Sequence, residues 1–426
     1  MLTIAKPPAA ATSASATAAT AVPPRKQPSV NADEWVRPNR EIIERATRLV
    51  PLIREHAAKT SEDRQVAPAV MQAIEQAGLF KLLVPKRYGG LGTNLRTLME
   101  TVAEVGRGDG STSWAVALLN VCTWFATTYS QRAQDEVFGQ NPNAKCCGIF
   151  TPGSKAERVE GGYRVSGRWA YASGSFAADW GTLGMFLPNQ EGGFTPALGL
   201  IPASAWTIED TWFVTGMKGS GSNTIVVVDH FVPDHRIQTF ADLMEARFAT
   251  PHQDTEPLAN MVFVPVAALV LVGAQLGLGR AMMDLTLERL PNKPVAYTTY
   301  AQSKNSPTHQ LAVASADTKI DLAYLLMQRA CADIDGAAAR GEVMSLLQRG
   351  RVRNDTGHIF ALVKEAFDIL MTANGAGAFA EPNIMNKLWR DSEIAGRHAY
   401  VTTEVGKEAY GRLLLGADGG IPLVAL

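Results

Sequence analysis

The residues of this chain that could do chemistry are one histidine and a few short hydroxyl residues beside glycine-rich turns. His398 follows closely after Trp389-Arg390-Asp391. Because an unperturbed imidazole has a pKa of about 6.5, it can gain or lose a proton near neutral pH. Thr151 and Ser173 precede the turn residues Pro152-Gly153 and Gly174-Ser175. Their hydroxyls either bind a ligand or simply cap turns, and a single histidine is most often exposed or structural.

The remaining histidines and the cysteines show no spacing typical of a metal site. The cysteines have no CxxC spacing and adjoin no paired histidines, which argues against both a zinc site and a disulfide framework. A reducing cytoplasm fits this usage. The residues concerned are His56, His230, His235, His252, His309, His358, Cys122, Cys146, Cys147 and Cys331.

Two groups of glycines could have a special role. Gly375 and Gly377 would allow close approach to the backbone, or they end a helix and begin a loop. Gly273, Gly277 and Gly279 superficially resemble a dinucleotide-binding fingerprint, but they lie in an apolar helical stretch with no preceding strand. Their expected role is therefore helix packing.

The elements that must position these residues follow the order α, β, α. Helical periodicity is seen at 38–59, 68–77, 95–105 and 113–129, the last capped by Ser111 or Thr112. Residues 146–232 show short β-branched and aromatic stretches, with a hairpin at 158–165, which indicates an antiparallel β domain. Long helical segments return near 264–290, 308–339, 354–374 and 385–414. The expected division is a tail at 1–33, a helical domain at 34–143, a β domain at 144–250 and a four-helix domain at 251–426.

Composition narrows the class of protein. The chain has 426 residues, 46% hydrophobic and 19% charged, which suits a large globular core. Forty Lys plus Arg against 41 Asp plus Glu give a formal charge of -1, and no single-sign run suggests nucleic acid or a membrane as partner. A small-molecule partner is expected.

Two segments resemble membrane or targeting signals only superficially. The apolar run from Met261 to Ala274 is too short for a membrane span and reads as a buried helix. The first thirty or so residues are rich in Ala, Ser, Thr and Pro without a leucine-rich stretch, so we expect a disordered tail and not a signal peptide. A removed targeting segment is the less favoured interpretation.

The order of elements and several local motifs together resemble the acyl-CoA dehydrogenase superfamily from about residue 35 onward. Each motif alone is weak, but their order and spacing make the resemblance specific. It implies an α+β fold with an N-terminal helical domain, a central antiparallel β domain and a C-terminal four-helix bundle. The motifs are Cys147–Gly153, Gly162–Trp169 leading into Tyr171–Ser175, Gly216–Asn223, and Trp389-Arg390-Asp391.

The resemblance implies a flavin site, since an isoalloxazine needs a flat, mostly apolar slot with a few fixed hydrogen-bond partners. In the family, the first loop and the following strand supply those partners. By position, Lys293 is similar to an arginine that relatives place on the cofactor from a neighbouring subunit, although its surroundings depart from the pattern. The implied cofactor-binding residues are Phe150, Thr151, Tyr171, Ser173, Lys293, Gly375 and Gly377.

One substitution separates two branches of the superfamily. Many dehydrogenases carry a catalytic Glu eight residues after an Arg-Asp pair, but here that position is Ala399. A histidine at the position of His398 is similar to the pattern of the flavin monooxygenase branch. That branch includes hydroxylases of phenols, indole and heteroaromatic sulfur compounds. A dehydrogenase with a displaced base, Asp284 or Glu288, remains the alternative.

The monooxygenase resemblance implies that reduced flavin and O2 form a C4a-hydroperoxide, which must be kept from water. Ser173 would hold the flavin N5 position, and His398 would accept a proton from the substrate or hydrogen-bond the peroxide. Phenol-hydroxylating relatives have a His-x-Trp element where this chain has Cys122-Thr123-Trp124, so a phenolate-binding histidine is missing there. Cys122, Trp124, Phe125 and Tyr400 are the expected substrate residues, unless they are simply core.

The sequence thus predicts the oxygenase component of a two-component monooxygenase. It would take reduced FAD or FMN from a separate NAD(P)H-dependent flavin reductase and hydroxylate a small phenolic or indole-like molecule as a cytoplasmic homotetramer. Since no nicotinamide-binding unit is recognisable, the electrons must come from elsewhere. Three alternatives stay open: the dehydrogenase, an N- or S-oxygenase on the same fold, and a catalytically silent binding or scaffold protein.

Overall fold

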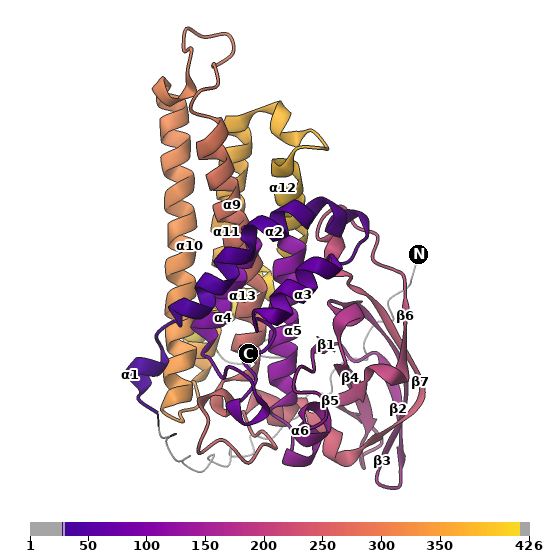
Figure 1. The fold of residues 1–426 in the computed structure, drawn as a ribbon. Helices are drawn as coiled ribbons and strands as arrows, with labels where there is room; N and C mark the ends of the chain where they lie inside the picture. Colours follow the sequence, from indigo (N-terminus) through magenta and orange to yellow (C-terminus); the bar gives the residue numbers. More distant parts are fainter. Residues whose placement is uncertain (1–27, 29, 418–426) are drawn as a thin grey trace.

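The computed structural model describes residues 28 and 30–417. The tail expected at 1–33 therefore lies outside the described residues, apart from its last positions. Helices occupy the first and last parts of the described residues, and a sheet formed from the middle of the chain lies at one side of the helical part (Figure 1). This is the α, β, α order expected from the sequence.

The N-terminal helices begin at side-chain caps that satisfy their first backbone N–H groups. Asn39, Asn94 and Asp109 accept from the third residue beyond them. Asp109, and not Ser111 or Thr112, is thus the cap of the helix expected at 113–129. The helices are α1 (Ala32–Trp35), α2 (Arg40–Glu62), α3 (Pro68–Gln76), α4 (Leu95–Gly106), α5 (Gly110–Ala126) and α6 (Gln131–Phe138).

The strands form one sheet in the order β6-β7-β3-β2-β4-β5-β8, with β1 pairing to β4. The hairpin expected at 158–165 is confirmed, because Arg158 pairs with Tyr163 across β2 and β3. The sheet is mixed, since β1 runs parallel to β4 and β2 meets β4 in parallel at one position. The strands are β1 (Cys146–Ile149), β2 (Ser154–Val159), β3 (Gly162–Ala172), β4 (Trp180–Pro188), β5 (Phe194–Pro202), β6 (Trp206–Glu209), β7 (Asn223–Pro233) and β8 (Ile237–Thr239).

The C-terminal domain differs from the expected four helices at its last segment. The helix expected at 385–414 is broken after Gly396, whose missing side chain leaves room for the Phe360 ring. A Cβ at Gly396 would overlap that ring, so this close approach requires glycine. The helices after the sheet are α7 (Phe240–Met244), α8 (Phe263–Leu269), α9 (Gly273–Arg289), α10 (Pro307–Ala339), α11 (Leu346–Asn374), α12 (Ile384–Ala395) and α13 (Thr403–Leu415).

Two buried helices connect the domains. Helix α5 is buried along nearly its whole length and contacts α4, α9 and β1, which explains its apolar character on every face. Helix α9 packs on α4 through its glycines, since a Cβ on Gly277 would collide with the Ala103 carbonyl. The packing role expected for these glycines is confirmed.

The apolar run expected to be a buried helix lies inside the molecule. Helices α8 and α9 with the short turn between them, Phe263–Arg289, are long and apolar enough to cross a membrane by composition alone. However, 94% of the most apolar window is buried against the rest of the protein. It therefore reads as core.

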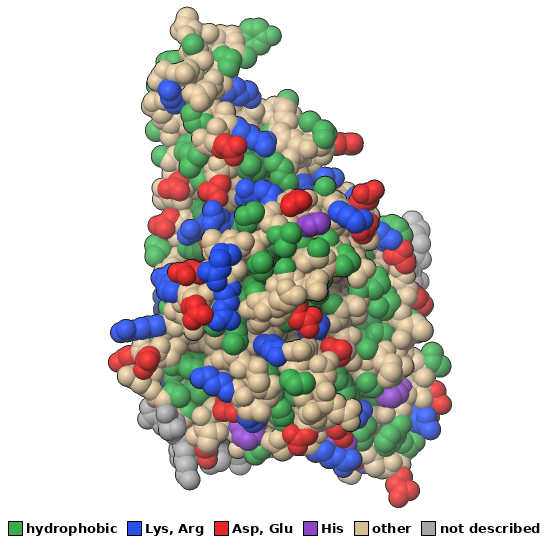
Figure 2. Space-filling model, viewed as in Figure 1, with side chains coloured by type: hydrophobic (Ala, Val, Ile, Leu, Met, Phe, Trp, Pro, Cys, Tyr) green, Lys and Arg blue, Asp and Glu red, His purple; other side chains and the backbone are tan. Residues whose placement is uncertain are grey.

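The face seen in Figure 2 carries acidic and basic side chains intermixed, with no large area of one sign. This distribution agrees with the nearly balanced charge of the sequence.

Candidate active site

Ser173 lies in a buried polar cluster at the end of β3. Its Oγ is 2.7 Å from Ser222 Oγ, and Ser222 Oγ is 2.8 Å from Ser220 Oγ. All three serines are less than 8% exposed. Ser222 and Ser220 belong to the Gly216–Asn223 motif, so the structure brings together two motifs that are distant in the sequence.

His398 lies in the break between α12 and α13. It precedes a short turn, Ala399–Val401, and its Nδ1 accepts the Tyr400 N–H at 3.2 Å. The chain is held open because Arg353 of α11 donates to the carbonyls of Ala399, at 2.8 Å, and of Tyr400. His398 is therefore a loop residue, not a helical one.

Trp114 of α5 connects these two candidate residues. Its Nε1–H donates to Ser173 Oγ at 3.0 Å, and its ring centroid is 6.2 Å from that of His398. No motif pointed to Trp114, although an indole N–H on a buried apolar helix requires a partner. Ser173, Trp114 and His398 thus meet where the sheet, the N-terminal helices and the last helical segment converge.

The surroundings of His398 keep its imidazole neutral. Loss of hydration and then the positive charge of Arg353 lower its pKa to about 4. The residue is nevertheless exposed to solvent in the single chain, so the direction of this shift holds only where its neighbours limit hydration of the ring. Since Nδ1 is occupied as an acceptor, the proton of the neutral ring lies on Nε2. His398 can therefore donate a hydrogen bond from Nε2.

The other residues expected around the isoalloxazine lie on the same part of the sheet. Tyr171 has a left-handed backbone (φ 66°) and a side chain that is 72% exposed, beside Trp212 at 6.1 Å. Thr151 is exposed in the loop after β1. Phe150 stacks in a cluster with Phe125 and Phe263, at 5.0 and 5.2 Å between ring centroids.

Lys293, Gly375 and Gly377 form a separate group at the end of α9 and α11. Lys293 Nζ donates to the Asn374 carbonyl at 2.7 Å, directly before Gly375. Both glycines face open space, since a Cβ on either would meet nothing within 4 Å. This end of the bundle projects away from the sheet (Figure 1), so a single chain does not bring the group to Ser173.

The expected substrate residues are divided. Tyr400 lies against His398, with ring centroids 5.9 Å apart. Trp124 is completely buried and its Nε1 donates to the Leu258 carbonyl at 2.8 Å, as in an ordinary core residue. Cys122 is buried beneath β1, and burial raises the pKa of its thiol; Phe125 is buried as well.

A buried charge cluster secures the frame of the site. Lys387 of α12 pairs with Asp391 at 2.6 Å and with Asp109, the cap of α5. Asp391 also accepts the Met217 N–H at 2.6 Å. The Asp of the Trp-Arg-Asp motif therefore fixes the turn that leads into Ser220 and Ser222, and this role was not evident from the sequence.

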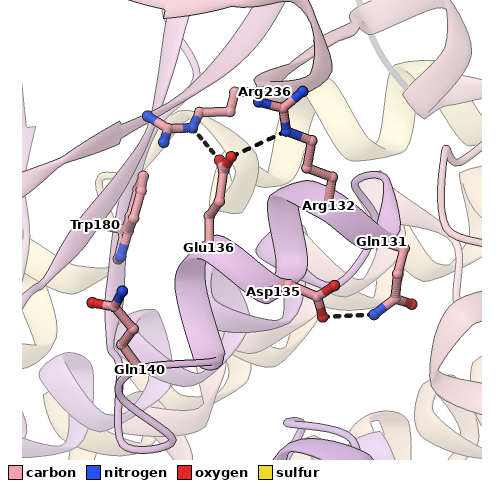
Figure 3. A pocket seen from close by; sticks show the side chains of 7 residues that line it. All are labelled: Gln131, Arg132, Asp135, Glu136, Gln140, Trp180 and Arg236. Carbon is pink, nitrogen blue, oxygen red and sulfur yellow. Dashed lines mark hydrogen bonds and ion pairs between the residues drawn. The ribbon is translucent and has the colours of Figure 1, made fainter.

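A polar hollow between α6 and the sheet lies apart from these residues (Figure 3). It measures about 640 Å³, and its charged groups are paired, with Glu136 bound to Arg236 at 2.6 Å. Arg236 also covers the Trp180 ring at 4.9 Å. None of the expected site residues lines it, so its size does not make it the reaction site.

Comparison with known proteins places this geometry in a family. The model of the acyl-CoA dehydrogenase N-terminal domain matches residues 40–138, and that of the C-terminal domain matches 269–403. The oxygenase component of an FADH(2)-dependent resorcinol hydroxylase from Rhizobium sp. is 32% identical, over 90% of this chain and 96% of that protein. The chain belongs to the flavin-dependent monooxygenases of the acyl-CoA dehydrogenase fold.

Other monooxygenases of this family align over a similar length. The oxygenase subunit HsaA from Rhodococcus jostii is 28% identical, over 89% of this chain and 99% of that one. The structure of XiaF from Streptomyces sp., in complex with FADH2 and glycerol, superimposes with a TM-score of 0.85 at 32% identity, covering 93% of this chain and 98% of that one. The expected fold and superfamily are confirmed.

Family membership removes the main support for the dehydrogenase alternative. Of the two carboxylates considered as its base, Asp284 is held by Arg107 at 2.9 Å. Glu288 is exposed on the surface of α9.

The residues present fit a flavin. Tyr171 offers an exposed aromatic surface at the strand end that carries Ser173. Ser173 follows it with a buried hydroxyl bonded to Trp114, and the Trp114 ring lies 6.2 Å from the imidazole of His398. Such a mixture of apolar surface and few oriented polar groups is what a flavin ring requires.

Proposed function

We propose that this monooxygenase is the oxygenase component of a two-component system that hydroxylates a small phenolic or indole-like molecule with reduced FAD or FMN and O2. The observation that carries the proposal is the Trp114 contact with both Ser173 and His398. Two similar proteins support the cofactor: a hydroxylase named as FADH(2)-dependent and a structure containing FADH2.

When bound, the reduced flavin would supply the two electrons that activate O2, and one oxygen atom of O2 would pass to the substrate while the other leaves as water. Ser173, with one lone pair taken by the Trp114 N–H, would hold the polar N5 edge of the ring. Tyr171, Thr151 and Phe150 would form the wall of the slot.

His398 would act as a hydrogen-bond donor at the reacting atoms. Because its ring is neutral with the proton on Nε2, it can donate to a substrate oxygen or to the oxygen being transferred. This favours the hydrogen-bonding role over proton acceptance, since Nδ1 is already engaged by the Tyr400 N–H.

Lys293, Gly375 and Gly377 would contact the cofactor's phosphate end. Since this group lies at the projecting end of the bundle, we propose that it serves a neighbouring subunit of a homotetramer. Lysine and open glycine backbone are suited to phosphate groups.

The aromatic substrate would lie against Tyr400 and His398, whose ring centroids are 5.9 Å apart. Relatives named as resorcinol hydroxylase, p-hydroxyphenylacetate 3-hydroxylase and indole-3-acetate monooxygenase support an aromatic substrate of this size. A separate NAD(P)H-dependent reductase would supply the flavin. A cytoplasmic location is supported by four cysteines that are all free and buried.

The test is single-turnover hydroxylation of a panel of phenols and indoles by protein mixed with chemically reduced flavin. His398→Ala should lower product per flavin about 100-fold, the usual effect of removing one such donor, with flavin affinity nearly unchanged. His309→Ala, which changes a histidine at the start of α10 bonded to Ser306, is the matched control. Equal product from the His398 variant and the control would refute the role of His398.

The pH dependence gives a second readout. Since the pKa of His398 is lowered to about 4, its neutral form persists well below pH 6.5. Hydroxylation should therefore hold down to about pH 5, while a loss centred near 6.5 would show a normally hydrated imidazole.

A further inference from the structure

The buried serines at the end of β3 form a continuous chain of hydroxyl groups. Ser173 Oγ lies 2.7 Å from Ser222 Oγ, which lies 2.8 Å from Ser220 Oγ. Either oxygen of each pair can be the donor. Their exposed fractions are 7, 4 and 3%. A chain of this kind can point in either direction, because every hydroxyl both donates and accepts.

One end of the chain has a fixed direction. An indole nitrogen is a donor only, so Trp114 always occupies one lone pair of Ser173 Oγ. Ser173 is left with one lone pair and one proton, and Ser222 determines which of the two remains available. If Ser173 donates to Ser222, it can accept from a ligand; if it accepts from Ser222, it must donate to the ligand.

The chemistry of the proposed cofactor makes this choice matter. The N5 atom of an oxidised flavin has a lone pair and accepts a hydrogen bond, whereas in the reduced flavin N5 carries a hydrogen and donates one. We propose that Ser222 and Ser220 are positioning residues that reverse the hydrogen bond of Ser173 when the redox state of the flavin changes. This inference rests on the proposed function, in which Ser173 holds N5.

The far end of the chain has space for the partner that both directions require. Ser220 is among the residues that line a cavity of about 30 Å³, together with Gln65, Gly174 and Gly221. That is enough for one or two water molecules. A water there accepts from Ser220 when the flavin is reduced and donates to it when the flavin is oxidised, so no hydroxyl stays unpaired in either state.

Removing Ser222 should affect the two flavin states unequally. In Ser222→Ala, Ser173 still donates to N5 of the oxidised flavin and still accepts from Trp114. It loses only the bond that it accepted from Ser222, so its proton remains bonded. With reduced flavin it can accept from N5–H, but its own proton then has no acceptor in a buried site. The affinity for reduced flavin should fall roughly tenfold or more relative to that for oxidised flavin. For a two-electron couple, tenfold corresponds to a reduction potential about 30 mV lower for the bound flavin.

The experiment is anaerobic titration of the full-length protein with oxidised and with dithionite-reduced FAD and FMN, followed by absorbance and fluorescence. Ser222→Thr, which keeps the hydroxyl, should restore the unaltered ratio of the two dissociation constants. Ser175→Ala is the matched control, because Ser175 is equally buried on the same segment but its Oγ has no hydrogen-bond partner. Ser175→Ala should leave the ratio unchanged.

The outcomes separate this inference from the proposal beneath it. The ratio compared is the dissociation constant of reduced flavin divided by that of oxidised flavin. A higher ratio in Ser222→Ala, with unaltered ratios in Ser222→Thr and Ser175→Ala, supports the reversing chain. If the unaltered protein binds reduced flavin but the ratio is unchanged in Ser222→Ala, the proposed role of the serine chain is refuted. The same change in Ser175→Ala would also refute it. Failure of the unaltered protein to bind any flavin would overturn the proposed function and this inference with it.

Discussion

The buried charge of Lys387 should contribute strongly to the stability of this fold. Its ammonium lies between Asp391, at 2.6 Å, and Asp109, and the two carboxylates are at most 1% exposed. Asp109 also accepts the Thr112 N–H and Oγ1–H, both at 2.8 Å, and so holds the start of α5. The cluster therefore connects α5, α12 and the turn at Met217.

Lys387→Met would keep most of the packing volume but leave two buried carboxylates without their cation. Removing one partner of a buried ion pair costs about 3–5 kcal/mol. Because the total stability of a folded protein is about 5–15 kcal/mol, this is a large part of it. Protonation would relieve the loss, since burial raises the pKa of Asp391 and the missing ammonium would no longer lower it. The deficit should therefore be largest above neutral pH and shrink as the pH falls toward 4.

The assay is urea unfolding of the variant and the unaltered protein at pH 5 and pH 8. The matched control is Lys364→Met, the same replacement at an exposed lysine paired with Asp368 at 2.8 Å. That variant should lose less than about 1 kcal/mol, as surface pairs do. A loss for Lys387→Met no larger than that of the control, or equal at both pH values, would refute the reasoning.

Two further variants probe burial and packing. Burial raises the pKa of Asp335 to about 7, so its stabilising contribution is full below the unfolded pKa of about 3.9 and is lost as pH rises through 7. The free energy of unfolding of Asp335→Asn, relative to that of the unaltered protein, should therefore be higher at pH 8 than at pH 5. The same difference at both pH values would contradict this. Gly396→Ala places a methyl group on the Phe360 ring and should cost about 1–3 kcal/mol. Gly396→Ala with Phe360→Leu should recover part of that loss, and no recovery would contradict the packing argument.

The parts of the fold that the sequence predicted well are those determined by local pattern. The first helices follow the 3.6-residue spacing of their apolar residues, and β2 and β3 follow the turn at Gly161-Gly162. The order of domains followed from such local signals. The parallel pairing of β1 with β4 did not, because it depends on contacts between strands about thirty residues apart.

The break after α12 shows why one site element was predicted incorrectly. Residues 385–414 have helical composition, so periodicity favours one long helix, but the Phe360 ring occupies the space beside Gly396. The carbonyls freed by the break are bonded by Arg353 from another helix. Both causes are tertiary. They change His398 from a residue on a helix to one in a loop whose Nδ1 is engaged, and so change the chemistry open to it.

The candidate residues themselves illustrate the same limit. Ser173 and His398 were predicted by their positions in motifs. Trp114 lies in none of the motifs, and Ser222 and Ser220 lie in one but had no predicted role, so all three were found only through their contacts. What those contacts determine is direction: a donor-only indole leaves Ser173 a choice between accepting and donating, and the occupied Nδ1 makes His398 a donor. The residue type determines which hydrogen bonds a side chain can make. The partners that it already has determine which of those hydrogen bonds remain for the cofactor and the substrate.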